Sequence, residues 1–140
     1  MDFFSAMDIS ASGLAAERTR VNVAASNLAN AETTRGPDGQ PYRRRDPVLE
    51  AVPFEAALAE PGAAPMGVRV AQIAQDPGPG RRVYSPGHPD ADPQGFVTLP
   101  DVNPTHEVVN LMSASRGFEA NATAVETLKT MAQRALEIAR

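Results

Sequence analysis

The sequence predicts a mainly α fold in which two long terminal helices pair as an antiparallel coiled coil around a middle segment of short strands and hairpins. All 13 prolines lie between Pro37 and Pro104, and proline breaks the interior of a helix. Both proline-free ends instead carry apolar residues at helical spacing. We therefore expect an N-terminal helix over 1–35, a Pro/Gly-rich insert of strands and loops over 36–103, and a C-terminal helix over 104–140.

The N-terminal helix is expected to present one apolar seam to its partner. Large apolar side chains recur at every seventh position, at Met7, Leu14, Val21 and Leu28. This interval keeps side chains on one side of a helix and is typical of coiled coils. Alanines around the seam favour the helix and let a neighbouring backbone approach closely.

The C-terminal helix is expected to begin at Asn103-Pro104, because Asn is a good N-cap and proline suits the first helical position. Its seam consists of Leu111, Phe118, Val125 and Leu128. Asn121 is the one strongly polar residue in that seam, where it either fixes the register of the partners or lies at a wet margin.

The middle segment is expected to form small hairpins or to lie extended along neighbouring subunits, because a structureless insert of this length would be unusual. Strand patterns separated by Pro-Gly turns cover 48–54, 68–70, 83–84 and 96–99. Residues 57–66, rich in Ala, Pro and Gly, are expected to form a loop.

Composition excludes several classes of function. The net charge of −4 leaves no basic excess for a nucleic acid, and without cysteine there is no disulfide, thiolate metal site or thiol nucleophile. No apolar run is long enough for a membrane span. The first basic residue is Arg18, so the N-terminus does not resemble a Sec-type signal peptide.

Two charged clusters contain side chains of the kinds found in chemical sites. His88, Asp90 and Asp92 have the side chains of a metal or acid/base site, but the prolines among them favour a polar turn bonded to its own backbone. Arg43-Arg44-Arg45 is either a solvated patch or a contact for an acidic neighbour or an anionic polymer such as cell-wall glycan. No phosphate loop or hydrolase motif is present. We predict no catalytic, cofactor or metal site and no small-molecule substrate.

Two helices and a small insert provide only a thin core. A core of this kind hardly offsets the conformational entropy of the chain. We therefore expect the free monomer to be marginally stable and to gain order by packing against other chains.

The N-terminal segment resembles the signature shared by the axial proteins of the bacterial flagellum, the rod and hook subunits. The residues that carry this resemblance are Ser12-Gly13-Leu14, the run from Val21 to Ala31 around Asn27-Leu28-Ala29-Asn30, and Thr33. The segment from Asn103 to Arg140, which includes Asn121, is similar to the matching C-terminal end of the same proteins. In the middle, Pro41-Tyr42-Arg43-Arg44 and the run from Val83 to Asp92 narrow the resemblance to the proximal rod subunits.

The resemblance implies a structural protein with no enzymatic activity. It implies export through the flagellar type III apparatus without a Sec signal, and helical assembly into the periplasmic rod that transmits torque. The implied partners are further copies of the chain, other rod proteins, the adaptor between rod and export apparatus, and the export machinery. Asn27, Asn30 and Asn121 are then candidates for polar contacts that set the register between subunits.

Three alternatives stay open from the sequence. One is another rod or hook-base subunit, which the run from His88 to Asp92 would distinguish. A second is a soluble helical adaptor or chaperone, which would be stably folded in isolation. The third, a glycan-cleaving enzyme, has the least support, because it would need a pair of carboxylates in a cleft and a thin two-helix protein offers no cleft wall.

Overall fold

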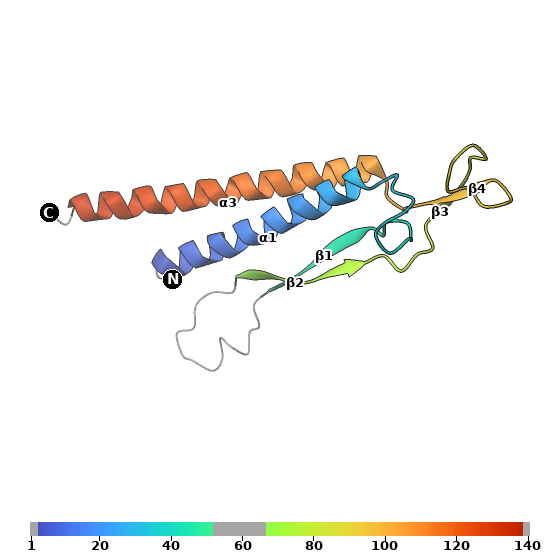
Figure 1. Ribbon diagram of the computed structural model, residues 1–140. Helices are drawn as coiled ribbons and strands as arrows, with labels where there is room; N and C mark the ends of the chain where they lie inside the picture. The colour runs from blue at the N-terminus through green and yellow to red at the C-terminus, as the bar shows by residue number, and fades with distance from the viewer. Residues whose placement is uncertain (1–2, 52–66, 139–140) are drawn as a thin grey trace.

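The computed structural model describes residues 3–51 and 67–138. Its two long helices pack against each other, one small sheet lies along α1 and the other projects beyond one end of the helix pair (Figure 1). Helix α1 spans Phe3–Ala29 and helix α3 spans Pro104–Ile138. Between them lie β1 (Arg45–Ala51), β2 (Val68–Gln75), β3 (Arg81–Tyr84) and β4 (Phe96–Leu99). The helices make up about half of the described residues. The expectation of a mainly α protein therefore overstates the helices, because the insert forms more strand than its pattern indicated.

The two helices lie side by side and run in opposite directions (Figure 1). A Cβ placed on Gly13 of α1 would lie 2.9 Å from the side chain of Asn121 on α3. Nearer the other end of the pair, Asn27 donates a hydrogen bond to Glu107. The two contacts are 27 − 13 = 14 residues apart along α1 and 121 − 107 = 14 residues apart along α3. The pair therefore keeps one register over this length.

The start of α3 follows the sequence prediction, whereas the end of α1 does not. The side-chain Oδ1 of Asn103 accepts hydrogen bonds from the backbone N–H groups of Thr105 (3.0 Å) and His106 (3.4 Å). This is the predicted N-cap in front of Pro104. Helix α1 was expected to reach residue 35 but ends at Ala29.

The buried interior is thin, as expected, and consists mostly of small side chains. In α1 the buried residues are Ala16, Val23, Ala24 and Asn27. In α3 they are Glu107 and Ala114. Small side chains at this contact allow the two helix backbones to approach closely, which explains the tight fit of Gly13 against Asn121.

The middle segment forms two separate antiparallel pairs, β1 with β2 and β3 with β4. Strands β3 and β4 include the predicted strands at 83–84 and 96–99, and β2 continues past the predicted 68–70 as far as Gln75. The predicted strand over 48–54 starts earlier, at Arg45, and its last three residues lie outside the described residues, as does the loop predicted over 57–66.

The β1–β2 ribbon is attached to α1 at two points. Near one end, the backbone N–H of Val68 donates to the Oγ of Ser12 (3.1 Å). Near the other end, the backbone of Arg45 bonds to the side chain of Asn27. A β-bulge between Val48 and Leu49 lies between these points, and a bulge increases the local twist of a strand. Both attachment points in α1, Ser12 and Asn27, are among the residues that carry the flagellar resemblance.

Candidate assembly site

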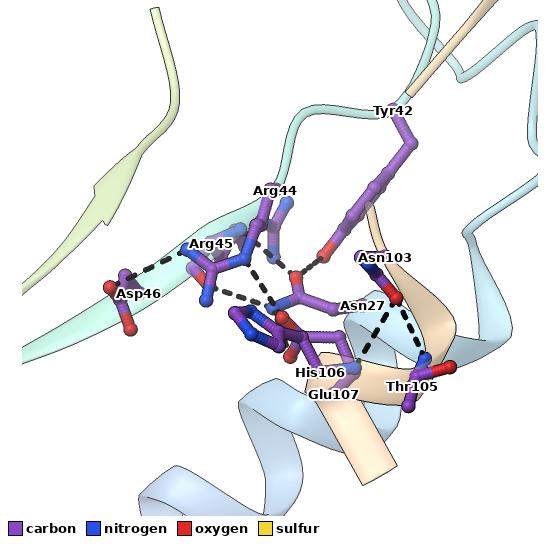
Figure 2. Close-up of polar contacts among 9 residues, drawn as sticks. All are labelled: Asn27, Tyr42, Arg44, Arg45, Asp46, Asn103, Thr105, His106 and Glu107. Atoms are coloured by element: carbon purple, nitrogen blue, oxygen red, sulfur yellow. Dashed lines mark hydrogen bonds and ion pairs between the residues drawn. The ribbon is translucent and has the colours of Figure 1, made fainter. Parts of the chain in front are cut away.

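Asn27 is the centre of a buried polar cluster that joins both helices to β1 (Figure 2). Its Nδ2 donates to the carbonyl oxygen of Arg45 (2.8 Å) and to Oε2 of Glu107 (3.0 Å). Its Oδ1 accepts from the backbone N–H of Arg45 (2.9 Å) and from the hydroxyl of Tyr42 (2.8 Å). These four bonds use both donors and both acceptor sites of the amide. We call this cluster the hub, and its members are Asn27, Tyr42, Arg44, Arg45 and Glu107.

The side chain of Asn27 takes the place of a neighbouring strand at Arg45. In an antiparallel sheet, a residue that exchanges both backbone bonds with its neighbour forms a hydrogen-bonded pair. The amide of Asn27 supplies the same donor and acceptor to Arg45 from a helix. This arrangement closes the outer edge of β1 at that point and fixes the strand on α1.

Glu107 connects the start of α3 to the hub. Its side chain is 1% exposed, and its Oε1 accepts a hydrogen bond from Nε of Arg44 at 2.8 Å. This hydrogen bond raises the pKa of Arg44 above its ordinary value, so the guanidinium stays charged. Glu107 also lies in the first turn of α3, where the helix dipole favours a negative charge.

The hub has the chemistry of a structural joint rather than of a reactive site. Every buried side-chain nitrogen or oxygen within residues 3–51 and 67–138 has a hydrogen-bond partner. The donors and acceptors of the hub are directed at one another, and none of its buried groups is left to bind a substrate. The contact between Arg44 and Glu107 could not be predicted from the sequence, because no local pattern links positions that far apart in the chain.

Asn27 was expected to make contacts that set the register between subunits, but its hydrogen bonds lie within the chain. Its amide is 1% exposed and is saturated within the chain, so it sets the register of α1, β1 and α3 with one another. The other motif residues also bond locally. Asn30 donates to the carbonyl of Ser26 (2.8 Å) and accepts from the hydroxyl of Thr33 (3.1 Å), which forms the turn after α1.

Asn121 lies against Gly13, and its Nδ2 donates to the carbonyl of Gly117 at 2.9 Å. Asn121 lies half-buried at the edge of the contact between α1 and α3, a position compatible with both alternatives from the sequence. A further role of Asn30, Thr33 or Asn121 between subunits stays a prediction.

The predicted seam residues are incompletely buried in the single chain. Phe118 is 38% exposed. The other seven are half-buried: Met7, Leu14, Val21, Leu28, Leu111, Val125 and Leu128. Each of these side chains retains apolar surface that a further chain can cover, and their role in assembly stays a prediction.

The His88–Asp92 run forms the predicted polar turn. Nδ1 of His88 accepts from the backbone N–H of Asp90 (3.0 Å), and Oδ1 of Asp92 accepts from the backbone N–H groups of Gln94 and Phe96 (2.9 Å each). The bond from Phe96 is the main cause that lowers the pKa of Asp92. No group of three or more His, Cys, Asp or Glu side chains in the described part of the chain is arranged to hold a metal ion.

The three consecutive arginines do not form a single patch. Arg44 is bonded within the hub, and the guanidinium of Arg45 lies 5.6 Å from the ring centre of Tyr42. Arg43 instead makes an exposed hydrogen bond, which its guanidinium donates to the side chain of Gln40 at 3.4 Å. The possible contact with an anionic partner is thus reduced to the exposed parts of Arg43 and Arg45.

Both ends of the chain match known flagellar protein families. Residues 7–37 match the family described as "Flagella basal body rod protein". Residues 94–138 match the family described as "Flagellar basal body rod FlgEFG protein C-terminal". These two matches cover the hub residues on both helices, and together they define the class as that of flagellar basal-body rod proteins.

Relatives along the full length specify the member of that class. Proteins named "Flagellar basal-body rod protein FlgC" are 44% identical in Yersinia enterocolitica over 99% of this chain and 98% of the relative. The relative in Bacillus subtilis is 39% identical over the whole of both chains. The chain belongs to the FlgC family. That name describes a component of the rod of the flagellar basal body. Neither of the described helices is long and apolar enough to cross a membrane.

Proposed function

We propose that this chain is a structural subunit of the proximal rod, where copies assemble helically with other rod subunits and transmit torque. The observation that carries the proposal is the similarity to FlgC proteins over 99% of the chain. The geometry agrees with this function, since the polar groups of the hub are bonded inside the chain and large apolar side chains remain on the surface.

The outer face of α3 supports assembly with neighbours. With 3.6 residues per turn, Val109, Met112, Met131 and Ile138 lie on the side of the helix away from Ala114. Their exposed fractions are 57%, 49%, 61% and 87%, whereas Ala114 is fully buried against the rest of the chain. A helix with apolar residues on two sides is normally buried on both. In the rod, neighbouring chains would cover the second side.

The helix pair itself is proposed to act as an antiparallel coiled coil whose seams are completed on assembly. The half-buried residues Leu14, Val21 and Leu28 leave apolar surface beside the α1–α3 contact. Side chains of adjacent copies that interdigitate there would pack at interior density and give the rod its stiffness. A helical array requires that different faces of one copy meet the next copy.

The location and route follow from the family resemblance and are proposed with it. The chain would pass through the flagellar type III export apparatus and assemble in the periplasm. Its partners there would be further copies, other rod subunits and the adaptor between the rod and the export apparatus. A thin, marginally stable helix pair is compatible with passage in an unfolded form.

The test is deletion of the gene followed by electron microscopy of purified basal bodies. Membrane rings without rod or hook, restored by the wild-type gene, would support a proximal rod subunit. Intact rods in the deletion strain would contradict it and would favour the helical adaptor. Urea unfolding of the purified chain separates the two further, because an adaptor would be much more stable in isolation than a marginally stable rod subunit.

A further inference from the structure

The outer edge of β2 has backbone groups that point away from its partner strand. Both backbone groups of Arg45 bond to Asn27, so Arg45 and Gln75, which face each other in the register, exchange no hydrogen bonds. The N–H and C=O of Gln75 must then point outward. Ile73 lies two residues earlier, opposite Pro47, and alternation along a strand gives it the same orientation. Pro47 agrees with this assignment, because it has no N–H to donate to Ile73.

This edge is open within the described part of the chain. None of residues 3–51 and 67–138 forms a hydrogen bond with the outward groups of Ile73 or Gln75. The side chain of Ile73 is 48% exposed, and the run from Val70 to Gln75 contains no charge and no proline. Edge strands usually carry charges or prolines that prevent pairing, so an edge without either is prepared for a partner strand.

The other strand edges of the described chain are shorter or are closed over part of their length. Asn27 and Pro47 close the outer edge of β1. Asp92 closes β4 at Phe96, with its backbone N–H to the carbonyl of Phe96 (2.8 Å) and its Oδ1 to the N–H of Phe96 (2.9 Å). Strand β3 carries Arg81 and Arg82. A sheet with one open edge and one closed edge accepts a single added strand and cannot extend in both directions.

We propose that the outer edge of β2, from Val70 to Gln75, receives one extended strand from a different rod subunit. This inference rests on the proposed function. Main-chain hydrogen bonds to Ile73 and Gln75 would supply affinity, and an apolar side chain of the added strand would cover Ile73. A second copy of this chain fits less well. Its matching open edge is β2 itself, and pairing β2 with β2 gives a closed two-fold dimer instead of a helical array.

A proline substitution tests the backbone edge directly. Ile73→Pro removes one outward N–H and no hydrogen bond of the β1–β2 ladder, so the hairpin keeps its pairing. We expect incorporation into purified basal bodies to fall at least about fivefold, as for the loss of a backbone hydrogen bond. The matched control Ile73→Val keeps the N–H, the β-branched shape and most of the apolar side chain, and it should incorporate within about twofold of wild type. Wild-type incorporation of Ile73→Pro, or equal loss in both variants, overturns the proposal.

A photo-crosslink identifies the added strand and covers the case in which Ile73→Pro fails to fold. p-Benzoylphenylalanine is placed at Gln75, and purified basal bodies are irradiated. An adduct with a different rod subunit, identified by mass spectrometry, is the expected result. An adduct between two copies of this chain, or no adduct although the chain is present, overturns the inference alone. Absence of the chain from basal bodies contradicts the proposed rod function instead.

Discussion

The two ends of the helix pair differ in burial: one end holds buried, hydrogen-bonded polar residues, and the other end exposes apolar side chains. At the hub end, Asn27 and Glu107 are each 1% exposed and every bond they make lies within the chain. At the other end, α3 continues beyond the start of α1 (Figure 1), and Phe4, Leu136 and Ile138 are 70%, 71% and 87% exposed. The comparison indicates that the fold of one subunit is fixed at the hub, while the far end is left for neighbouring chains to cover.

We expect the hub to contribute specificity more than stability. Removing two charged groups from water costs several kcal/mol, and their attraction often does little more than offset this cost. Breaking such a pair is expensive, however, because one charged partner is left without its counterpart. The hub therefore acts against alternative registers of α1, β1 and α3, and substitutions there should have larger effects on folding than substitutions at the far end.

The largest effect on the fold is expected from Glu107→Ala. It removes the partner of Arg44 and one acceptor of Asn27, and we expect a loss of about 3 kcal/mol in the free energy of unfolding. A thin two-helix protein would then be mostly unfolded in isolation. Urea unfolding followed by the helical circular dichroism signal measures the change. Retention of wild-type helicity would show that the hub does not hold the pair together.

Asp46→Ala is the matched control for the same arginine. Asp46 is the exposed partner of Arg44, at 3.5 Å and with 67% of its side chain exposed. Exposed ion pairs contribute little, so we expect a change within about 0.5 kcal/mol. A loss comparable to that of Glu107→Ala would mean that the charge of Arg44, and not the buried contact, is what matters.

A smaller effect is expected where the helices touch at Gly13. A Cβ at that position would lie 2.9 Å from the amide of Asn121, which is held by its bond to Gly117. We expect Gly13→Ala to destabilise the chain by about 1 kcal/mol, in spite of the better helix propensity of alanine. With Asn121→Ala in place, the same change should become neutral or stabilising. A double-mutant cycle by urea unfolding checks this coupling, and additive effects would disprove the contact.

At the far end, Ile138→Asp should leave the isolated fold unchanged within about 0.5 kcal/mol, because the side chain is already in solvent. Incorporation into basal bodies should nevertheless be lost, since a neighbour would have to bury the new charge. Purified basal bodies probed by immunoblot give the readout. Normal incorporation would show that this end stays exposed in the rod and would remove the contrast with the hub.

The smallest effect concerns acid and the β3–β4 hairpin. Hydrogen bonds from the Phe96 and Gln94 backbone and from Arg82 lower the pKa of Asp92 below its usual 3.8. The stabilisation is therefore complete above that ordinary value and is lost as the pH falls through the lowered one. Amide exchange at Phe96, followed by NMR, should accelerate only under strongly acidic conditions. In Asp92→Asn this acid dependence should vanish, and its persistence would assign the titration to another group.

The sequence predicted the elements that depend on local signals. Signals from neighbouring residues predicted the N-cap at Asn103, the two helices in the proline-free terminal segments, and the strands β3 and β4. The length of β2 was missed, since its Ala and Gln residues carry little strand preference. The hub was missed because Arg44 and Glu107 meet only after α1 and α3 pair. Asn27 was selected from the family motif, but its partners could not be identified without the fold.

The contact between Asn27 and Glu107 also determines when, during folding, the chain can reach its final structure. These residues are separated by 80 positions, so their contact closes a loop that includes most of the molecule. Closure of a loop this long carries an entropic cost before any packing offsets it, and folds dominated by such distant contacts form slowly. A chain interrupted before Glu107 has an α1 with no partner helix. The subunit can therefore reach its final form only after nearly all of its residues are available together.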